Sequence, residues 1–200
     1  MDAATQPSNL NIANLLTVLR IVGVPLFGWL LLVDDGGSEG MRLWAWLAFG
    51  LLMVTDRIDG DLARRHNLVT DFGKIADPIA DKALTGMAFV GLSIIGVLWW
   101  WVTIVVLVRE WGITLMRFVV IRYGVMPASQ GGRIKTTLQA VALGGYILPL
   151  ELWDNPVSTV VLWMTHVVMG AAVAITLYTA VQYVRDAVRL RREQKDGAGA

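Results

Sequence analysis

The chain contains no cysteine, and this absence removes several kinds of chemistry at once. Disulfides, thiolate nucleophiles and cysteine-ligated zinc are all excluded, so any catalysis must depend on carboxylates and bases. Charged residues are also scarce, at 16% of 200 residues, whereas apolar residues make up 56%. This balance lies outside that of ordinary soluble domains and is typical of a membrane protein. A formal net charge of +1 does not point to nucleic acid, and no nucleic-acid partner is expected.

Long uncharged runs divide the chain into six expected helices. A membrane span needs about 20 mostly apolar residues, so the chain has room for one bundle and no separate soluble domain. The Trp99, Trp100 and Trp101 triplet is expected at a membrane interface, where the third helix turns into the fourth. We therefore predict an all-α, polytopic membrane bundle of six transmembrane helices in a single domain, residues 1–187, followed by a basic cytoplasmic tail, residues 188–200. The predicted helices lie at about 12–33, 42–64, 73–98, 101–124, 133–151 and 157–187.

Basic and acidic connections alternate along the chain. Basic residues gather at 64–66, 122–135 and 185–195, whereas the connections between them are acidic or uncharged. The positive-inside rule then places both termini and the basic connections on the cytoplasmic side of a bacterial-type plasma membrane, with Arg42 as an exception. Several uncharged runs are too short for a full span, and the shortfall lies at their cytoplasmic ends. A polar active-site cavity is therefore expected in the cytoplasmic half of the bundle.

The densest polar stretch runs from Thr55 to Lys82 and reads TDRIDGDLARRHNLVTDFGKIADPIADK. Carboxylates and small residues recur in it at helical spacing, so two successive helices present carboxylates on one face each. Four carboxylates in a low dielectric require cations to neutralise them, and all-oxygen ligation favours hard divalent ions. We therefore predict a two-metal site that clamps a phosphate. The residues at this spacing are Asp56, Asp59, Gly60 and Ala63 on one helix and Gly73, Asp77 and Asp81 on the next.

The same stretch contains the complete pattern D-x2-D-G-x2-A-R-x8-G-x3-D-x3-D, which resembles the signature of the CDP-alcohol phosphotransferase family. The resemblance implies that a phosphatidyl group is transferred from CDP-diacylglycerol to an alcohol, with release of CMP and with two divalent cations, magnesium or manganese. It implies that Asp81 is a metal ligand and the general base. Further metal ligands by resemblance are Asp56, Asp59 and Asp77. CDP-lipid-binding positions by resemblance are Asp56, Asp59, Gly60, Ala63, Arg64, Thr70 and Gly73, with Asn14 and Thr17 bordering the nucleotide.

Cations in the fourth and fifth predicted helices bear on the acceptor alcohol. The stretches REWGITLMR and GGRIKTTLQ resemble the phosphatidylglycerophosphate synthase branch of the family, whose acceptor is sn-glycerol 3-phosphate. A phosphorylated acceptor needs several cations beside the metal site. Arg109 lies roughly 12 Å along its helix from Trp101, too deep for an interfacial anchor. The candidate acceptor-phosphate residues are Arg109, Arg117, Arg133 and Lys135.

Several alternatives remain open from the sequence. The aspartates could cap helix ends, and Arg109 could simply pair with Glu110 or with an aspartate. The other cations could extend to anionic headgroups at the membrane surface. An enzyme with another acceptor, such as inositol phosphate, would use the same metal site. A divalent-cation transporter would need a polar path through the outer half of the bundle, and no such path is visible in the sequence.

Small residues in the last two predicted helices indicate close helix packing. Such residues let helix backbones approach one another, either within one chain or between two copies. A homodimer is the expected assembly. The residues are Gly144, Gly145, Gly170, Ala171 and Ala172.

Overall fold

The computed structural model describes residues 12–65, 71–120 and 130–197. Within these ranges all regular secondary structure is helical and there is no β-strand, as the sequence predicts. The elements are α1 (Ile12–Leu32), the short 3-10 helix η1 (Val33–Gly36), α2 (Glu39–Arg65), α3 (Asp71–Ile94), α4 (Trp100–Val120), α5 (Gln130–Ile147) and α6 (Pro156–Gly197).

Three helix ends differ from the sequence prediction for local reasons. α3 ends at Ile94 instead of near residue 98, because Gly96 adopts a φ of 77° and turns the chain before the tryptophans. α5 ends at Ile147 instead of near residue 151, because Pro149 disfavours a helical conformation at the residue before it. α6 continues to Gly197, beyond the expected end at 187, since its last turns consist mainly of arginine, glutamate, glutamine and lysine, which are strong helix formers.

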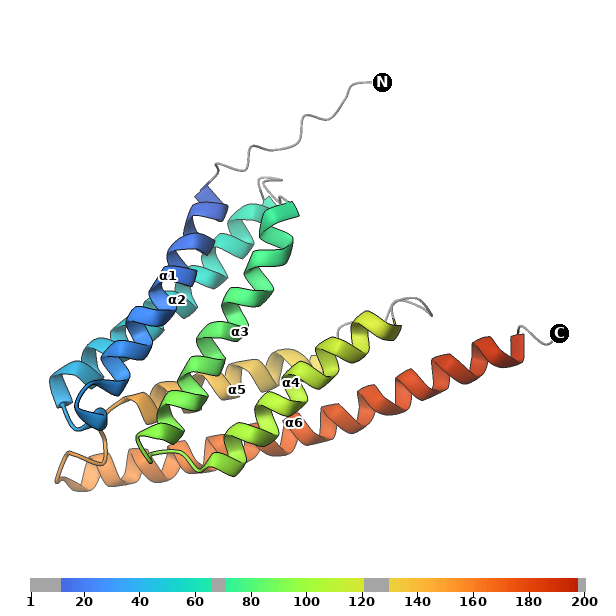
Figure 1. The fold of residues 1–200 in the computed structure, drawn as a ribbon. Helices are drawn as coiled ribbons and strands as arrows, with labels where there is room; N and C mark the ends of the chain where they lie inside the picture. The colour runs from blue at the N-terminus through green and yellow to red at the C-terminus, as the bar shows by residue number, and fades with distance from the viewer. Residues whose placement is uncertain (1–11, 66–70, 121–129, 198–200) are drawn as a thin grey trace.

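The helices form two groups of three (Figure 1). α1 packs against both α2 and α3, whereas α6 packs against α5 and α4. Contacts of α5 with α2 and α3, and of α4 with α3, join the two groups. α6 runs along the outer side of the second group and extends past the other helices. The shared core contains Phe27, Leu31, Phe89, Leu92 and Tyr146, each at most 1% exposed.

The turns at η1, at residues 95–99 and at residues 148–155 lie at one end of the bundle, which we call the turn end (Figure 1). The start of α6 there is fixed by its own sequence. Asn155 Oδ1 accepts a hydrogen bond of 2.8 Å from the backbone N–H of Ser158, as an N-cap residue does. Pro156 follows it as the first helical residue, where its missing N–H costs nothing.

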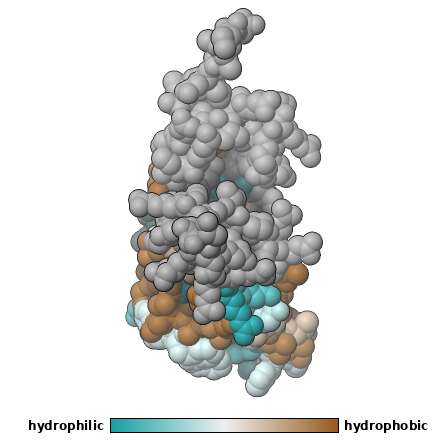
Figure 2. Space-filling model, turned by 90° about the vertical axis from the view of Figure 1, so that its right-hand side faces the viewer, coloured by the Kyte–Doolittle hydropathy of each residue, from teal (hydrophilic) through white to brown (hydrophobic). Residues whose placement is uncertain are grey.

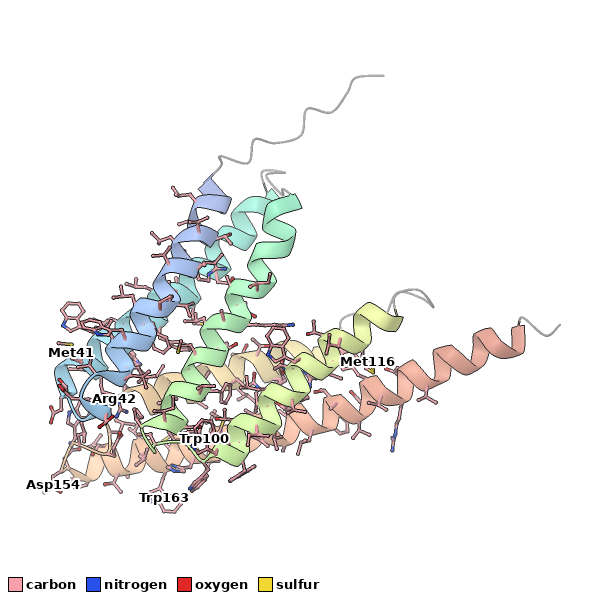
Figure 3. All side chains as sticks on the ribbon, in the orientation of Figure 1. Met41, Arg42, Trp100, Met116, Asp154 and Trp163 are labelled. Carbon is pink, nitrogen blue, oxygen red and sulfur yellow. The ribbon has the colours of Figure 1, made fainter. Side chains whose placement is uncertain are left out.

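A buried arginine ties α2 to the end of α5 at the turn end (Figure 3). Arg42 is 1% exposed and pairs with Glu151. Its guanidinium also donates to backbone carbonyls that a helix terminus leaves without an intrahelical partner. Arg42 is the basic residue that did not fit the alternation of basic and acidic connections. The structure explains its position, because the arginine is buried and bonds two helices together. The carbonyl acceptors are those of Gly36 at 3.3 Å, Tyr146 at 2.7 Å, Ile147 at 2.9 Å and Leu148 at 2.9 Å.

Large hydrophobic side chains cover much of the outer surface. Leu51, Val108 and Trp163 are among those that are more than 60% exposed. Figure 2 shows hydrophobic residues along the flanks of the described part of one face, with hydrophilic residues gathered between them. Among the described residues, Leu15–Gly36 and Pro156–Asp186 are each long and apolar enough to cross a membrane. Such a surface is typical of a protein that lies in a lipid bilayer.

One of the small residues brings α5 and α6 together. Gly145 lies against Thr165, and a Cβ atom at Gly145 would overlap the threonine side chain. The predicted close packing within the chain is thus present at this position. A Cβ atom at Gly170 would have no described atom within 4 Å, so this residue is not needed for packing within the described part of the chain. The homodimer stays a prediction.

Candidate active site

The structure brings Asp56 of α2, Asp81 of α3 and Arg20 of α1 into one cluster. Arg20 Nη1 lies 2.6 Å from Asp56 Oδ1, and the arginine side chain is fully buried. Asp81 interacts electrostatically with both Asp56 and Arg20. The first and last aspartates of the signature therefore lie close together, although 24 residues separate them in the sequence. We call these three residues the acidic cluster.

The other signature residues are located by the backbone alone. Asp59 lies three residues after Asp56 on α2, and Asp77 lies four residues before Asp81 on α3, so each shares a helix face with its neighbour. Among the described side chains, no group of three or more acidic or histidine residues forms a metal site. Thr70 lies outside the described residues. The structure describes only the backbone of the remaining predicted positions, which are Asn14, Asp59, Gly60, Ala63, Arg64, Gly73 and Asp77.

Thr17 and Arg20 share one face of α1, three residues apart, and both are buried. Thr17 was a predicted nucleotide-bordering residue, whereas Arg20 was not among the predicted site residues. The signal that could have identified Arg20 is its charge within an otherwise uncharged apolar helix. An ionisable side chain at such a position is expensive and marks a functional site by default.

A second cluster joins α4 and α5. Glu110 Oε1 accepts a hydrogen bond of 3.1 Å from Arg109 Nη1 and another from Lys135 Nζ. The side chains of Arg109 and Lys135 are only 9% and 4% exposed. We call these three residues the cation cluster. Glu110 thus brings together two of the four predicted acceptor-phosphate residues; the side chains of the other two, Arg117 and Arg133, lie outside the described part.

The contacts of the cation cluster bear on two alternatives that the sequence leaves open. The alternative pairing of Arg109 with Glu110 is present in the structure. Lys135 is buried and bonded to Glu110, so it does not extend to lipid headgroups. Pairing does not use all the donors of Arg109, because its buried Nε has no hydrogen-bond partner among the described residues. An arginine nitrogen that is buried and unsatisfied is costly unless a ligand accepts its hydrogen bond.

The acidic and cation clusters are neighbours. Asp81 interacts electrostatically with Glu110, and Lys135 interacts electrostatically with Asp81. Lys82, next to Asp81, donates to Thr114 Oγ1 and lies 5.1 Å from the centre of the Trp111 ring, which links α3 to α4 at this level. A predicted base and two predicted phosphate-binding cations are therefore connected through Glu110 and Lys135, and we call this group of side chains the polar region.

Threonines of α6 also contact the polar region. These contacts were not predicted from the sequence. Thr179 Oγ1 accepts a hydrogen bond of 2.7 Å from Arg109 Nη2. One turn away, Gln139 Nε2 donates to Thr176 Oγ1 at 3.2 Å. The available signal is the spacing of Thr176, Thr179 and Tyr183 at i, i+3 and i+7, which places a polar stripe on an apolar helix.

The fold and the site together are typical of a helical membrane protein in which partly exposed carboxylates lie beside buried cations. The sequence profile of the CDP-alcohol phosphatidyltransferase family matches residues 10–181. The chain belongs to this family.

Individual relatives cover most of the chain. A probable phosphatidylglycerophosphate synthase from Mycobacterium tuberculosis (strain H37Rv) is 48% identical over 179 residues, which cover 90% of this chain and 82% of the relative. The CDP-diacylglycerol–glycerol-3-phosphate 3-phosphatidyltransferase of Bacillus subtilis (strain 168) is 35% identical over 168 residues, with 77% and 86% covered. A CMP-forming cardiolipin synthase from Streptomyces coelicolor is 39% identical over a shorter stretch of 118 residues, with 59% and 55% covered.

Proposed function

We propose that this protein transfers the phosphatidyl group of CDP-diacylglycerol to sn-glycerol 3-phosphate, giving phosphatidylglycerol phosphate and CMP. The observation that supports it most directly is the position of Asp81 beside a cluster that contains Arg109 and Lys135. An acceptor that carries both a phosphate and a hydroxyl fits this arrangement, since the cations attract the phosphate and the carboxylate takes the hydroxyl proton. The printed names of the relatives from M. tuberculosis and B. subtilis support the same reaction.

We propose further that all six α-helices cross a bacterial plasma membrane. The shortest, α5, has 18 residues, which is roughly 27 Å of helix and close to the hydrocarbon thickness. Arg20 and Lys135 each lie 12 residues from the helix end nearest the turn end, or roughly 18 Å along the helix. The basic connections favour a cytoplasmic position for both termini and for the site, so that CMP would be released on that side.

The acidic cluster fits divalent metal ions. Its carboxylates approach one another inside the bundle, and their oxygen ligands suit magnesium or manganese. We propose that Asp56, Asp59, Asp77 and Asp81 hold two such ions, with the fully buried Arg20 fixing the Asp56 carboxylate. When bound, the ions offset the charge of the pyrophosphate and stabilise the CMP leaving group.

The protein's own residues then bind the acceptor and accept its proton. The acceptor hydroxyl oxygen attacks the phosphorus next to the diacylglycerol, and its proton moves to the Asp81 carboxylate. The bond from that phosphorus to the bridging oxygen breaks, and CMP leaves with the electron pair. Lys135 and Arg109 hold the acceptor phosphate, and the unsatisfied Nε of Arg109 donates to one of its oxygens. Glu110 keeps the two cations close together between turnovers.

Replacing either cation should weaken acceptor binding selectively. We expect Arg109→Gln and Lys135→Gln each to raise the KM for sn-glycerol 3-phosphate by roughly 30- to 100-fold, because a charge-assisted bond to phosphate is lost. The KM for CDP-diacylglycerol should change less than about threefold. Steady-state kinetics of CMP release in mixed micelles measures both constants. Arg185→Gln, which removes an exposed cation from α6, is the matched control and should change neither.

The acceptor itself is tested by CMP release from CDP-diacylglycerol by the purified full-length protein, with magnesium or manganese. The acceptors compared are sn-glycerol 3-phosphate, inositol phosphate, phosphatidylglycerol and none. We expect release to depend on sn-glycerol 3-phosphate. Release that requires inositol phosphate or phosphatidylglycerol would keep the family reaction and contradict the proposed acceptor. Absence of metal-dependent release with every acceptor would contradict the proposed reaction.

A further inference from the structure

Arg109 is held by two residues of α6, a helix that carries none of the proposed ligands or acceptor cations. Its Nη2 donates to Thr179 Oγ1 at 2.7 Å, and its guanidinium carbon lies 5.8 Å from the centre of the Tyr183 ring. Thr179 and Tyr183 are four residues apart on α6 and therefore share one helix face. This face contacts α4 at the level of the cation cluster.

The Thr179 hydroxyl is oriented to accept from Arg109. Its own hydrogen is directed to the backbone carbonyls of α6, with oxygen distances of 2.8 Å to Ile175 and 3.1 Å to Thr176. An oxygen lone pair is then left for the guanidinium, and the threonine side chain is 1% exposed, so water does not compete for it. The Tyr183 ring adds a cation–π contact across the guanidinium.

These contacts determine which edge of Arg109 is free. Nη1 is bonded to Glu110 and Nη2 to Thr179, whereas the buried Nε has no partner among the described residues. Without Thr179, the guanidinium could turn about its flexible side chain and bond to Glu110 with two nitrogens, as arginine and carboxylate prefer. That arrangement would use the donors needed for a ligand.

We propose that Thr179 and Tyr183 are positioning residues that hold the Arg109 guanidinium in the orientation that binds the acceptor phosphate. The inference depends on the proposed function, in which Arg109 binds that phosphate. It assigns to α6 a part in acceptor recognition and predicts that this helix affects the acceptor and not the CDP-lipid.

The test compares isosteric variants of two buried threonines on α6. Thr179→Val removes the hydroxyl that Arg109 uses, whereas Thr165→Val removes a hydroxyl that bonds to the Val161 carbonyl of its own helix. We expect Thr179→Val to raise the KM for sn-glycerol 3-phosphate about tenfold, with kcat and the KM for CDP-diacylglycerol within twofold of the original protein. Thr179→Ser keeps a hydroxyl at this position and should have the same KM for sn-glycerol 3-phosphate as the original protein. Thr165→Val should also leave this KM unchanged.

Tyr183 gives a second readout of the same proposal. Tyr183→Leu removes the ring that contacts the guanidinium and should raise the acceptor KM several-fold. Gel filtration and thermal unfolding of each variant establish that the protein is folded.

An unchanged acceptor KM in folded Thr179→Val, together with a raised KM in Arg109→Gln, would overturn the positioning role and leave the proposed function intact. An unchanged KM in Arg109→Gln would instead contradict the proposed acceptor site. A Thr179→Val variant that lowers kcat and unfolds earlier without a selective effect on the acceptor would show a merely structural role and overturn the proposal.

Discussion

Replacing Asp81 with asparagine is expected to lower kcat for CMP release by roughly a thousandfold, because a positioned general base contributes about 10²- to 10⁴-fold. Asparagine has nearly the same shape but cannot accept the hydroxyl proton as a carboxylate does. Asp81 belongs to the acidic cluster and interacts electrostatically with Glu110 and Lys135 of the cation cluster. The KM for sn-glycerol 3-phosphate should therefore change only a few-fold, since the proposed phosphate-binding residues Arg109 and Lys135 are unaltered.

The measurement is steady-state CMP release at saturating CDP-diacylglycerol and sn-glycerol 3-phosphate. Asp154→Asn provides a matched control, because Asp154 is exposed and lies at the turn end (Figure 3), away from the acidic cluster. The control should retain kcat within twofold. An Asp81→Asn variant that keeps more than about a tenth of the original kcat would show that Asp81 is not the base.

Replacing Arg42 with methionine is expected to cause the largest loss of stability. The variant keeps the length of the side chain but leaves the Glu151 carboxylate and several helix-end carbonyls without their buried donor. The Glu151 side chain is 30% exposed and can be solvated, so most of the loss comes from the carbonyls. Each buried carbonyl left without a donor costs about 1–3 kcal/mol, and we expect a total loss of about 3–5 kcal/mol. For a chain of this size, such a loss corresponds to a fall in Tm of roughly 10 °C.

Thermal unfolding in detergent, followed by gel filtration or by tryptophan fluorescence, measures this effect. Glu151→Gln is the matched variant, because it removes only the charge and keeps both an acceptor for Arg42 and the carbonyl bonds. Its Tm should fall by less than half as much. Folded Arg42→Met at low temperature should retain the acceptor KM, since the substitution lies at the turn end. An unchanged Tm in Arg42→Met would show that the ion pair and its carbonyl bonds do not hold α2 to α5.

The sequence predicted the helices and the motif face because both depend on local spacing. Asp56 and Asp59 share a helix face by their separation alone, and Asp77 and Asp81 do the same on the next helix. The uncharged runs likewise predicted the first and last residues of most helices to within a few positions. Errors occurred where one residue changed the backbone, as Gly96 did at the end of α3 and Pro149 did after α5.

The tertiary partners of the buried charges could not be predicted in this way. Arg42 and Glu151 are 109 residues apart, and Arg109 and Thr179 are 70 residues apart. Nothing in the spacing along one helix indicates which side chain on another helix will satisfy a buried guanidinium. The sequence therefore identified Arg109 as a phosphate-binding candidate but gave no indication that α6 holds it in place.

The most direct test of the proposed reaction follows an isotopic label from acceptor to lipid. The purified protein is incubated with CDP-diacylglycerol, magnesium and sn-glycerol 3-phosphate labelled uniformly with carbon-13, and the lipid and CMP are quantified by mass spectrometry. We expect one labelled phosphatidylglycerol phosphate for each CMP released, and formation of both products roughly a thousandfold slower with Asp81→Asn. CMP released together with unlabelled phosphatidic acid would show that water is the acceptor and would contradict phosphatidyl transfer to glycerol 3-phosphate.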